Sequence, residues 1–145
     1  MKPDRFFTTK ESMRTIDTFR ILFAGLAVIS FFLTEAGRFV YRPYIYSNGI
    51  NDFGLADSMG NLGGIMVQIF LMLAVLNPPR KIAHHTFLFV IVGYILYEIL
   101  QLILPKGIFD WKDVLGTIIG GIIAYSIYLL MRVLLRNNKT YFVIK

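Results

Sequence analysis

The sequence predicts an all-α membrane protein of four transmembrane helices, built as two helical hairpins of the same orientation with both termini in the cytoplasm. Three observations predict this fold class: a hydrophobic content of 56% over 145 residues, four stretches long enough to cross a bilayer, and an uneven distribution of Lys and Arg between the loops. Soluble domains are usually about 45–50% apolar. The length suits one compact unit and not two domains.

A helix needs about 20 mainly apolar residues to cross the hydrocarbon core of a bilayer. Four stretches satisfy this requirement, at about 19–41, 57–76, 86–104 and 114–135. Proline cannot continue a helix, and it disfavours helical geometry in the residue before it. We therefore expect the first three helices to end at Pro43, Pro78 and Pro105.

The basic residues predict the orientation, because cytoplasmic loops of membrane proteins are enriched in Lys and Arg. Eleven of the 15 lie in a basic N-terminal segment (1–18, with Arg20), the loop between the second and third spans, and the end of the chain. These parts should be cytoplasmic, on either side of a transmembrane domain at 19–136 that is followed by a tail at 137–145. Six of the nine acidic residues lie towards the opposite side: Glu35, Asp52, Asp57, Glu98, Asp110 and Asp113.

The two hairpins share a pattern that indicates an internal repeat. Residues 53–64 and 109–120 both read F-x3-D-x2-G-x3-G, 56 residues apart. Upstream of each copy, a helix carries an acidic residue and a polar residue three positions later, Glu35 with Arg38 and Glu98 with Gln101. We interpret the chain as two copies of one unit, related by an axis along the membrane normal.

The glycines of the repeat predict close helix packing, because small residues four apart let helix backbones approach in lipid. The four positions are Gly60, Gly64, Gly116 and Gly120. Asp57 and Asp113 share a helix face with these glycines and should point into the bundle. Two interpretations of the aspartates stay open: each caps its own helix N-terminus, or both belong to a polar site.

Glu98 is the strongest candidate for a site, since an ionisable side chain inside a transmembrane helix costs about 2.5–3.5 kcal/mol on insertion scales. The repeat predicts an acidic, outward-facing cup that contains it. The candidate binding residues are Glu98, Gln101, Asp110, Asp113, Glu35, Arg38, Asp57 and Asn61, with Thr117 equivalent to Asn61. Such a cup can bind a polar headgroup, relay protons or hydrolyse a bond, and the sequence does not separate these.

Residues 97–121, YEILQLILPKGIFDWKDVLGTIIGG, resemble the signature of VanZ-like bacterial membrane proteins. The matching positions are Glu98, Gln101, Lys106, Asp110, Asp113 and Gly120, and the sequence departs from the pattern at Thr117, where the family usually has Asn. The resemblance implies a multi-pass protein of the bacterial inner membrane that acts at the outer leaflet on cell-envelope lipids or their precursors. The family takes its name from a member associated with teicoplanin resistance.

Three functional hypotheses follow. The first is a VanZ-like protein whose cup binds a lipid-linked or glycopeptide headgroup. The second is an accessory structural subunit of a larger membrane complex, or a homo-oligomer. The third and least favoured is a membrane hydrolase that uses Glu98 and Asp113, because no catalytic motif is present. We expect membrane lipids as partners, no nucleic acid, no cofactor and no metal site; without cysteine, thiolate ligands are excluded.

Overall fold

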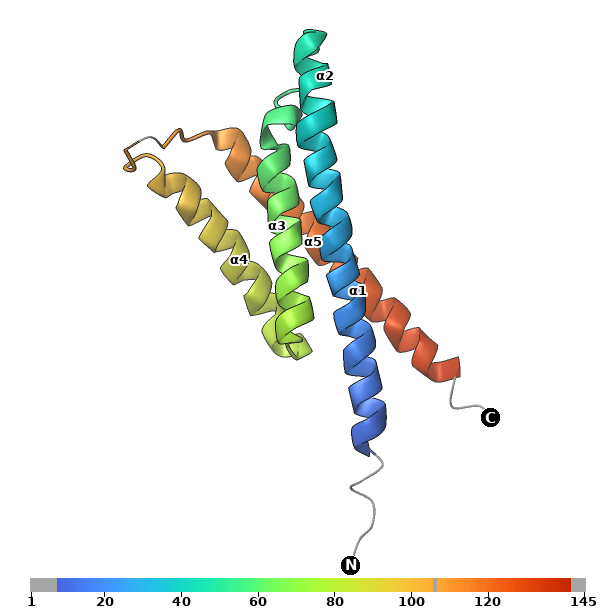
Figure 1. The fold of residues 1–145 in the computed structure, drawn as a ribbon. Coiled ribbons are helices and arrows are strands. Elements are labelled where there is room, and N and C mark those ends of the chain that lie inside the picture. Colours follow the sequence, from blue (N-terminus) through green and yellow to red (C-terminus); the bar gives the residue numbers. More distant parts are fainter. Residues whose placement is uncertain (1–7, 106, 142–145) are drawn as a thin grey trace, which may run out of the picture.

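The computed structural model describes the backbone of residues 8–105 and 107–141 and the side chains of residues 18–105 and 107–135. The predicted all-α fold with four long apolar helices is confirmed (Figure 1). The candidate membrane spans are Thr18–Ser47, Leu55–Leu76, Arg80–Leu100 and Trp111–Leu135. The start of α1 and the end of α5, towards the two termini, lie near one end of the bundle, with the connection between α3 and α4 (Figure 1).

The first span is a single rod made of α1 (Thr8–Ala36), η1 (Gly37–Tyr41) and α2 (Arg42–Ser47). The expectation that Pro43 ends this helix is therefore wrong. The Arg42 N–H donates to the carbonyl of Gly37, five residues back, so the rod already contains a wider π-helical turn when it reaches Pro43. Pro43 then lies in the first turn of α2, where its missing N–H and fixed φ are tolerated.

The second span, α3 (Leu55–Leu76), ends where the sequence predicts. Asn77 adopts a left-handed conformation with φ 43°, and its N–H donates to the Leu73 carbonyl over 3.0 Å. This is a standard helix C-terminus, which asparagine tolerates better than most residues. Two prolines then separate α3 from α4.

The third span, α4 (Arg80–Leu100), is displaced from its predicted range of 86–104. It begins six residues earlier, directly after Pro79, and ends at Leu100. The next residues form turns rather than helix, so Pro105 is not the helix terminator. Consequently Glu98 lies in the last turn of α4 rather than deep along it.

The fourth span belongs to α5 (Trp111–Tyr141), which is longer than the predicted 114–135. Helix α1 likewise begins at Thr8, so most of the predicted N-terminal segment and tail continue the adjoining helices. The remaining parts of those two segments, residues 1–7 and 142–145, lie outside the described residues.

Helix α3 is central and packs against both α1 and α5. Glycines allow these contacts: a Cβ on Gly116 would lie 2.8 Å from the Ser58 carbonyl oxygen, and one on Gly120 would lie 2.3 Å from that of Leu62. On its other side, Gly63 faces Thr34 of α1 at a distance that leaves no room for a Cβ. The sequence did not single out Gly63.

Two of the four repeat glycines lie elsewhere than predicted. A Cβ on Gly60 would meet nothing within 4 Å, and one on Gly64 would face the Tyr94 hydroxyl of α4, 3.5 Å away. The repeat glycines that the contact between α3 and α5 requires are therefore the two on α5, Gly116 and Gly120. The remaining core is aromatic, with Phe23 of α1 and Tyr128 of α5 fully buried at the end of the bundle that holds the termini.

Candidate functional site

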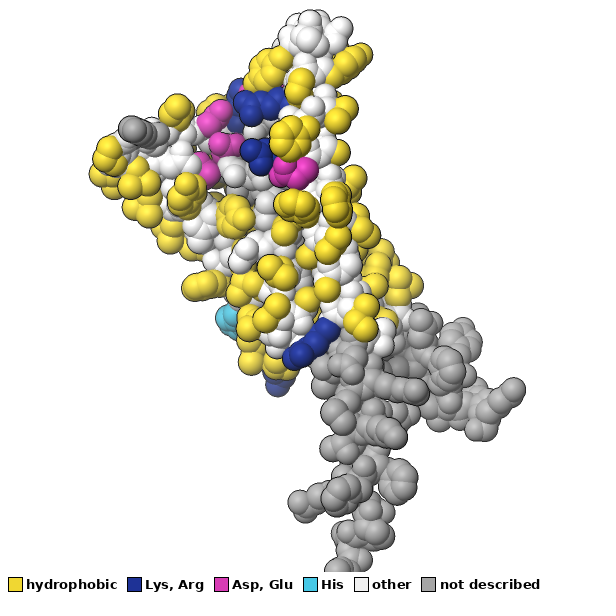
Figure 2. Space-filling view, viewed as in Figure 1, with side chains coloured by type: hydrophobic (Ala, Val, Ile, Leu, Met, Phe, Trp, Pro, Cys, Tyr) yellow, Lys and Arg dark blue, Asp and Glu magenta, His cyan; other side chains and the backbone are white. Residues whose placement is uncertain are grey.

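Acidic and basic side chains gather at the end of the bundle away from the termini. Figure 2 shows them side by side below α2, in a notch bordered by the connection between α4 and α5, while hydrophobic side chains cover much of the visible face. Two groups occupy this end. We call them the Glu98 group (Asn61, Glu98, Gln101, Asp113 and Thr117) and the Asp57 group (Arg42, Tyr46, Asp57 and Lys112).

Glu98 is only 2% exposed, although it lies near the end of α4. Both of its carboxylate oxygens accept hydrogen bonds from amides. Asn61 Nδ2 on α3 donates to Oε1, and Gln101 Nε2 donates to Oε2, each over 3.0 Å. The bond from Asn61 ties α3 to α4. No cation pairs with Glu98 among the described residues.

Asp113 lies within electrostatic range of three carboxylates, those of Glu98, Asp110 and Asp57, and of one cation, Arg42. It sits in the first turn of α5 and is partly buried. In the part of the chain whose side chains are described, no hydrogen bond or ion pair is formed by its carboxylate. The Glu98 group thus brings two carboxylates together, and no described basic side chain forms an ion pair with either.

Thr117 is fully buried one turn after Asp113, and its Oγ1 has no hydrogen-bond partner in the described structure. Its direction follows from its neighbours on α5. Gly120 faces Leu62 and Ile65 of α3, and Gly121 faces Ile91 of α4. At about 100° per residue, Thr117 lies between these two directions and points into the space between α3 and α4. Glu98 occupies the same space through its bond to Asn61.

The heights of these residues also agree. Ile91 of α4 packs at Gly121 of α5, and the two helices run in opposite directions (Figure 1). Glu98 is seven residues beyond Ile91, and Val114 is seven residues before Gly121. Because both steps advance about 10 Å along the axis, Glu98 lies at the level of Val114, next to Asp113, and Thr117 lies about 4.5 Å further towards the middle of the bundle.

In the Asp57 group the carboxylate is paired with two cations. Arg42 Nη2 lies 3.4 Å from Asp57 Oδ1, and Lys112 Nζ lies 3.1 Å from Oδ2. The Tyr46 hydroxyl donates a short hydrogen bond to Oδ1, and its ring lies under the Arg42 guanidinium. This group connects α2, α3 and α5, and one carboxylate faces two cations.

Helices α3 and α5 are capped by Asp52 and Asp110, and not by the two aspartates that the sequence suggested. Asp52 accepts from the N–H groups of Gly54 and Ala56 over 3.0 and 2.6 Å, at the start of α3. Asp110 accepts from the Lys112 N–H over 2.9 Å, at the start of α5. No described backbone N–H bonds to the carboxylate of Asp57 or of Asp113. Both are therefore available for the polar groups instead.

Glu35 and Arg38 form their own ion pair, 3.2 Å between Nη1 and Oε1, on a more exposed part of the rod. Within the described residues no hydrogen bond or ion pair joins this pair to either group. The predicted cup is thus smaller than expected on its α1 side. Lys106, the basic position of the resembled pattern, lies outside the described residues.

Gln101 connects the Glu98 group with the surface. It borders an open pocket of about 430 Å³, which is also lined by Tyr97, Leu104, Pro105 and Gly107. A Cβ on Gly107 would lie 2.2 Å from the Gln101 carbonyl oxygen, so the connection after α4 folds closely back on the helix end. The pocket therefore borders the residue whose amide bonds to Glu98.

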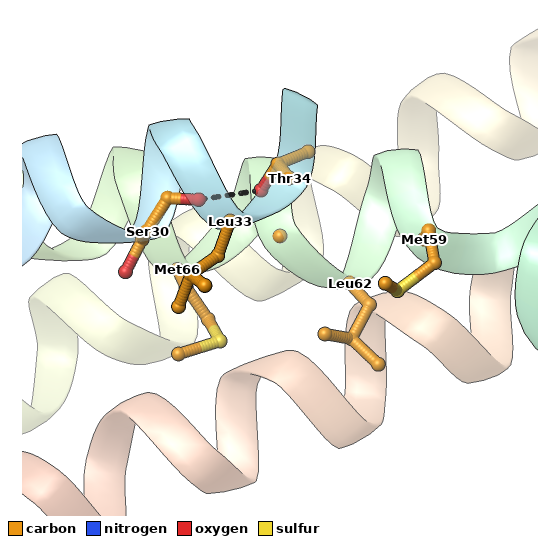
Figure 3. A pocket seen from close by; sticks show the side chains of 7 residues that line it. Ser30, Leu33, Thr34, Met59, Leu62 and Met66 are labelled. Atoms are coloured by element: carbon orange, nitrogen blue, oxygen red, sulfur yellow. Dashed lines mark hydrogen bonds between the residues drawn. The ribbon is translucent and has the colours of Figure 1, made fainter. Parts of the chain in front are cut away.

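A second pocket, of about 110 Å³, lies between α1 and α3 and is almost wholly apolar (Figure 3). Its lining includes Leu33, Met59, Leu62 and Met66. The one internal hydrogen bond drawn there runs from the Thr34 hydroxyl to the Ser30 carbonyl over 2.7 Å. Such a bond satisfies the hydroxyl within its own helix, so this pocket offers little beyond van der Waals contact.

The family model for VanZ/LLP1 matches residues 6–132. The chain belongs to the VanZ/LLP1 family. The match extends from α1 through most of α5, so the resemblance that residues 97–121 indicated is confirmed and covers both polar groups. No curated protein and no solved structure matches the chain. This VanZ/LLP1 protein is thus a membrane protein with four candidate spans whose polar residues converge at one end.

Proposed function

We propose that this VanZ/LLP1 family protein binds the polar headgroup of a cell-envelope lipid or glycopeptide at the polar end of its bundle. The observation that carries the proposal is Glu98, a carboxylate that is 2% exposed and held by amides from two helices beside a second, unpaired carboxylate. Buried ionisable groups in membrane proteins face the interior and mark functional pathways. Headgroup binding also fits the association of the member that gave the family its name with teicoplanin resistance.

The polar end faces outward in this proposal, in the inner membrane of a bacterium. The charge distribution supports it. The N-terminal segment, the connection between α3 and α4 and the C-terminal segment carry eleven of the 15 basic residues. The start of α1, the start of α4 and the end of α5 lie at the opposite end of the bundle (Figure 1). By the positive-inside rule that end is cytoplasmic. In this orientation the protein binds the headgroup at the outer leaflet.

An internal repeat accounts for the way the polar end is built. Asp57 and Asp113 both lie in the first turn of their helices. Glu35 and Glu98 each accept a hydrogen bond from the residue three positions later, Arg38 or Gln101. These parallels support two copies of one hairpin, of which the second has specialised by burying its glutamate.

The test is Glu98→Gln in a strain that lacks the native copy. The side chain keeps its size, and Gln101 can reverse its amide so that its oxygen faces the new donor. We expect loss of the envelope phenotype, measured as susceptibility to teicoplanin and other envelope-acting antibiotics, at unchanged protein abundance. Glu35→Gln removes a carboxylate outside the two groups and serves as the matched control. Wild-type behaviour of Glu98→Gln would contradict the proposal.

The competing function is that of an accessory subunit in a larger membrane complex. It predicts a large particle of fixed composition when the native protein is extracted in mild detergent. Headgroup binding by an autonomous protein predicts one or two copies of the chain with bound lipid. The mass of the intact particle distinguishes the two.

A further inference from the structure

We infer that the polar end recognises a zwitterionic phosphoethanolamine headgroup, with the Glu98 group taking its primary ammonium and the Asp57 group its phosphate. This inference rests on the proposed function and names the chemistry of its ligand. It follows from the charge balance of the two groups, which have opposite signs.

The negative half is the Glu98 group. The negative charges of Glu98 and Asp113 repel each other. No Lys or Arg forms an ion pair with either carboxylate among the described side chains. Asn61 and Gln101 supply hydrogen bonds but no charge. Buried carboxylates normally have a charged partner. The group therefore favours a cationic ligand.

Thr117 indicates what kind of cation is bound. Its hydroxyl is fully buried, has no partner in the described structure and points into the same space as Glu98. A buried polar group without a partner destabilises the protein that holds it. A primary ammonium has three donors and no acceptor, which matches in number the three acceptor side chains Glu98, Asp113 and Thr117. A quaternary ammonium has no N–H to donate.

The positive half is the Asp57 group. Asp57 is shared by Arg42 and Lys112, which leaves one positive charge in excess. Both cations remain partly exposed, at 48% and 34% of the side chain, so their other N–H groups can reach a ligand. Arg and Lys are the usual partners of phosphate in proteins.

The two halves are neighbours. Asp113 lies within electrostatic range of both Glu98 and Arg42, and Lys112 precedes Asp113 in the chain. A ligand that carries one cation and one anion a few bonds apart satisfies both halves. A simple anion would meet the two unpaired carboxylates, and a simple cation would meet Arg42 and Lys112.

The experiment uses the full chain in nanodiscs that contain equal amounts of phosphatidylethanolamine, phosphatidylcholine and phosphatidylglycerol. Lipids that stay bound after gentle release are counted by native mass spectrometry. We expect phosphatidylethanolamine to be enriched over phosphatidylcholine by about tenfold or more, because a hydrogen bond to a charged group contributes about 1.5–3 kcal/mol. Equal retention of the two lipids would overturn the inference.

Two variants keep the test valid if one fails to fold. Glu98→Gln should abolish the preference. Thr117→Val removes a hydroxyl that has no described partner, so it should leave the thermal unfolding temperature unchanged or raised, and should weaken the preference about tenfold. Thr117→Ser should retain it. A preference that survives both Glu98→Gln and Thr117→Val, with both variants folded, would place the ligand elsewhere.

The source of the headgroup is resolved by competition. If soluble glycerophosphoethanolamine displaces the lipid, the headgroup alone is recognised. If it does not, the intact lipid is the ligand, and both outcomes support the shared chemistry. Failure of this inference is distinguishable from failure of the proposed function. Equal retention of the lipids would reject phosphoethanolamine as the ligand. If Glu98→Gln nevertheless loses the envelope phenotype, headgroup binding remains supported.

Discussion

At the residue scale, the buried carboxylate of Glu98 is stabilised by hydrogen bonds from the neutral amides of Asn61 and Gln101. Asn61→Ala removes the one donor that comes from another helix. We expect it to lower the free energy of unfolding by about 1–3 kcal/mol, because it leaves a buried acceptor unsatisfied. The measurement is reversible unfolding in mixed micelles. Asn48→Ala is the matched control. The Asn48 amide donates to the Tyr44 carbonyl at an exposed position. Its removal should therefore lower the free energy of unfolding by only a few tenths of the loss in Asn61→Ala. Equal losses of unfolding free energy in the two variants would mean that the burial of Glu98 does not increase the cost of losing its donor.

A second residue-scale prediction concerns Asp52, the aspartate that caps α3. Asp52→Ala removes acceptors from two backbone N–H groups and should lower the free energy of unfolding by about 0.5–2 kcal/mol. The two N–H groups donate to different oxygens, so Asp52→Asn keeps only one of the two bonds and should restore about half of the loss. The same unfolding assay measures both. If Asn behaves like Ala, the role of Asp52 is electrostatic and not that of a cap.

The sequence contained the signal for this cap, but the repeat drew attention to Asp57. Asn51 and Asp52 precede Gly54, whose φ of 86° requires a residue without a Cβ, and the helix begins at the next position. An Asx residue followed by glycine before an apolar run is a local turn and capping pattern. By contrast, the partnership of Glu98 with Asn61 spans 37 residues, and no local pattern specifies it.

At the element scale, glycine is needed at one face of the α3–α5 contact and not at the other. Gly120→Ala would drive a Cβ into the backbone of Leu62, so the helices must separate, at a cost of about 1–3 kcal/mol. Gly60→Ala meets nothing and should stabilise the helix by up to about 1 kcal/mol. Thermal unfolding in detergent measures both. A loss in Gly60→Ala as large as that in Gly120→Ala would show that this packing does not determine stability.

The number and order of the helices could be predicted, because each span is a long apolar run. Their ends could not always be predicted. Tyr46 lies one turn after Arg42, so the two side chains share a face and can both reach Asp57 only if the helix continues past Pro43. The local π-helical turn that permits this leaves no clear mark in the sequence. The Asp57 group was therefore missed as a unit, although Asp57 itself was a candidate.

At the scale of the whole molecule, the bundle is polarised along its length. One end holds the two polar groups, and the other holds the termini and an aromatic core in which the Arg132 guanidinium lies over the rings of Phe19 and Tyr128. The four described spans run between these ends, and the bonds within the two polar groups join different helices. Binding there should therefore stabilise the assembled bundle, as any ligand specific for the native state does.

This polarity gives the last prediction, the orientation in the membrane. The native chain has no cysteine, so single-cysteine variants can be labelled without background. Ser47→Cys places a thiol at the exposed end of α2, and Lys81→Cys places one at the exposed start of α4, at the opposite end of the bundle. A membrane-impermeant maleimide added to intact cells should label position 47 and should reach position 81 only after lysis. This result follows from the excess of Lys and Arg at the end that holds the termini. The reverse pattern would put both polar groups in the cytoplasm, where their ligand would have to be an inner-leaflet headgroup.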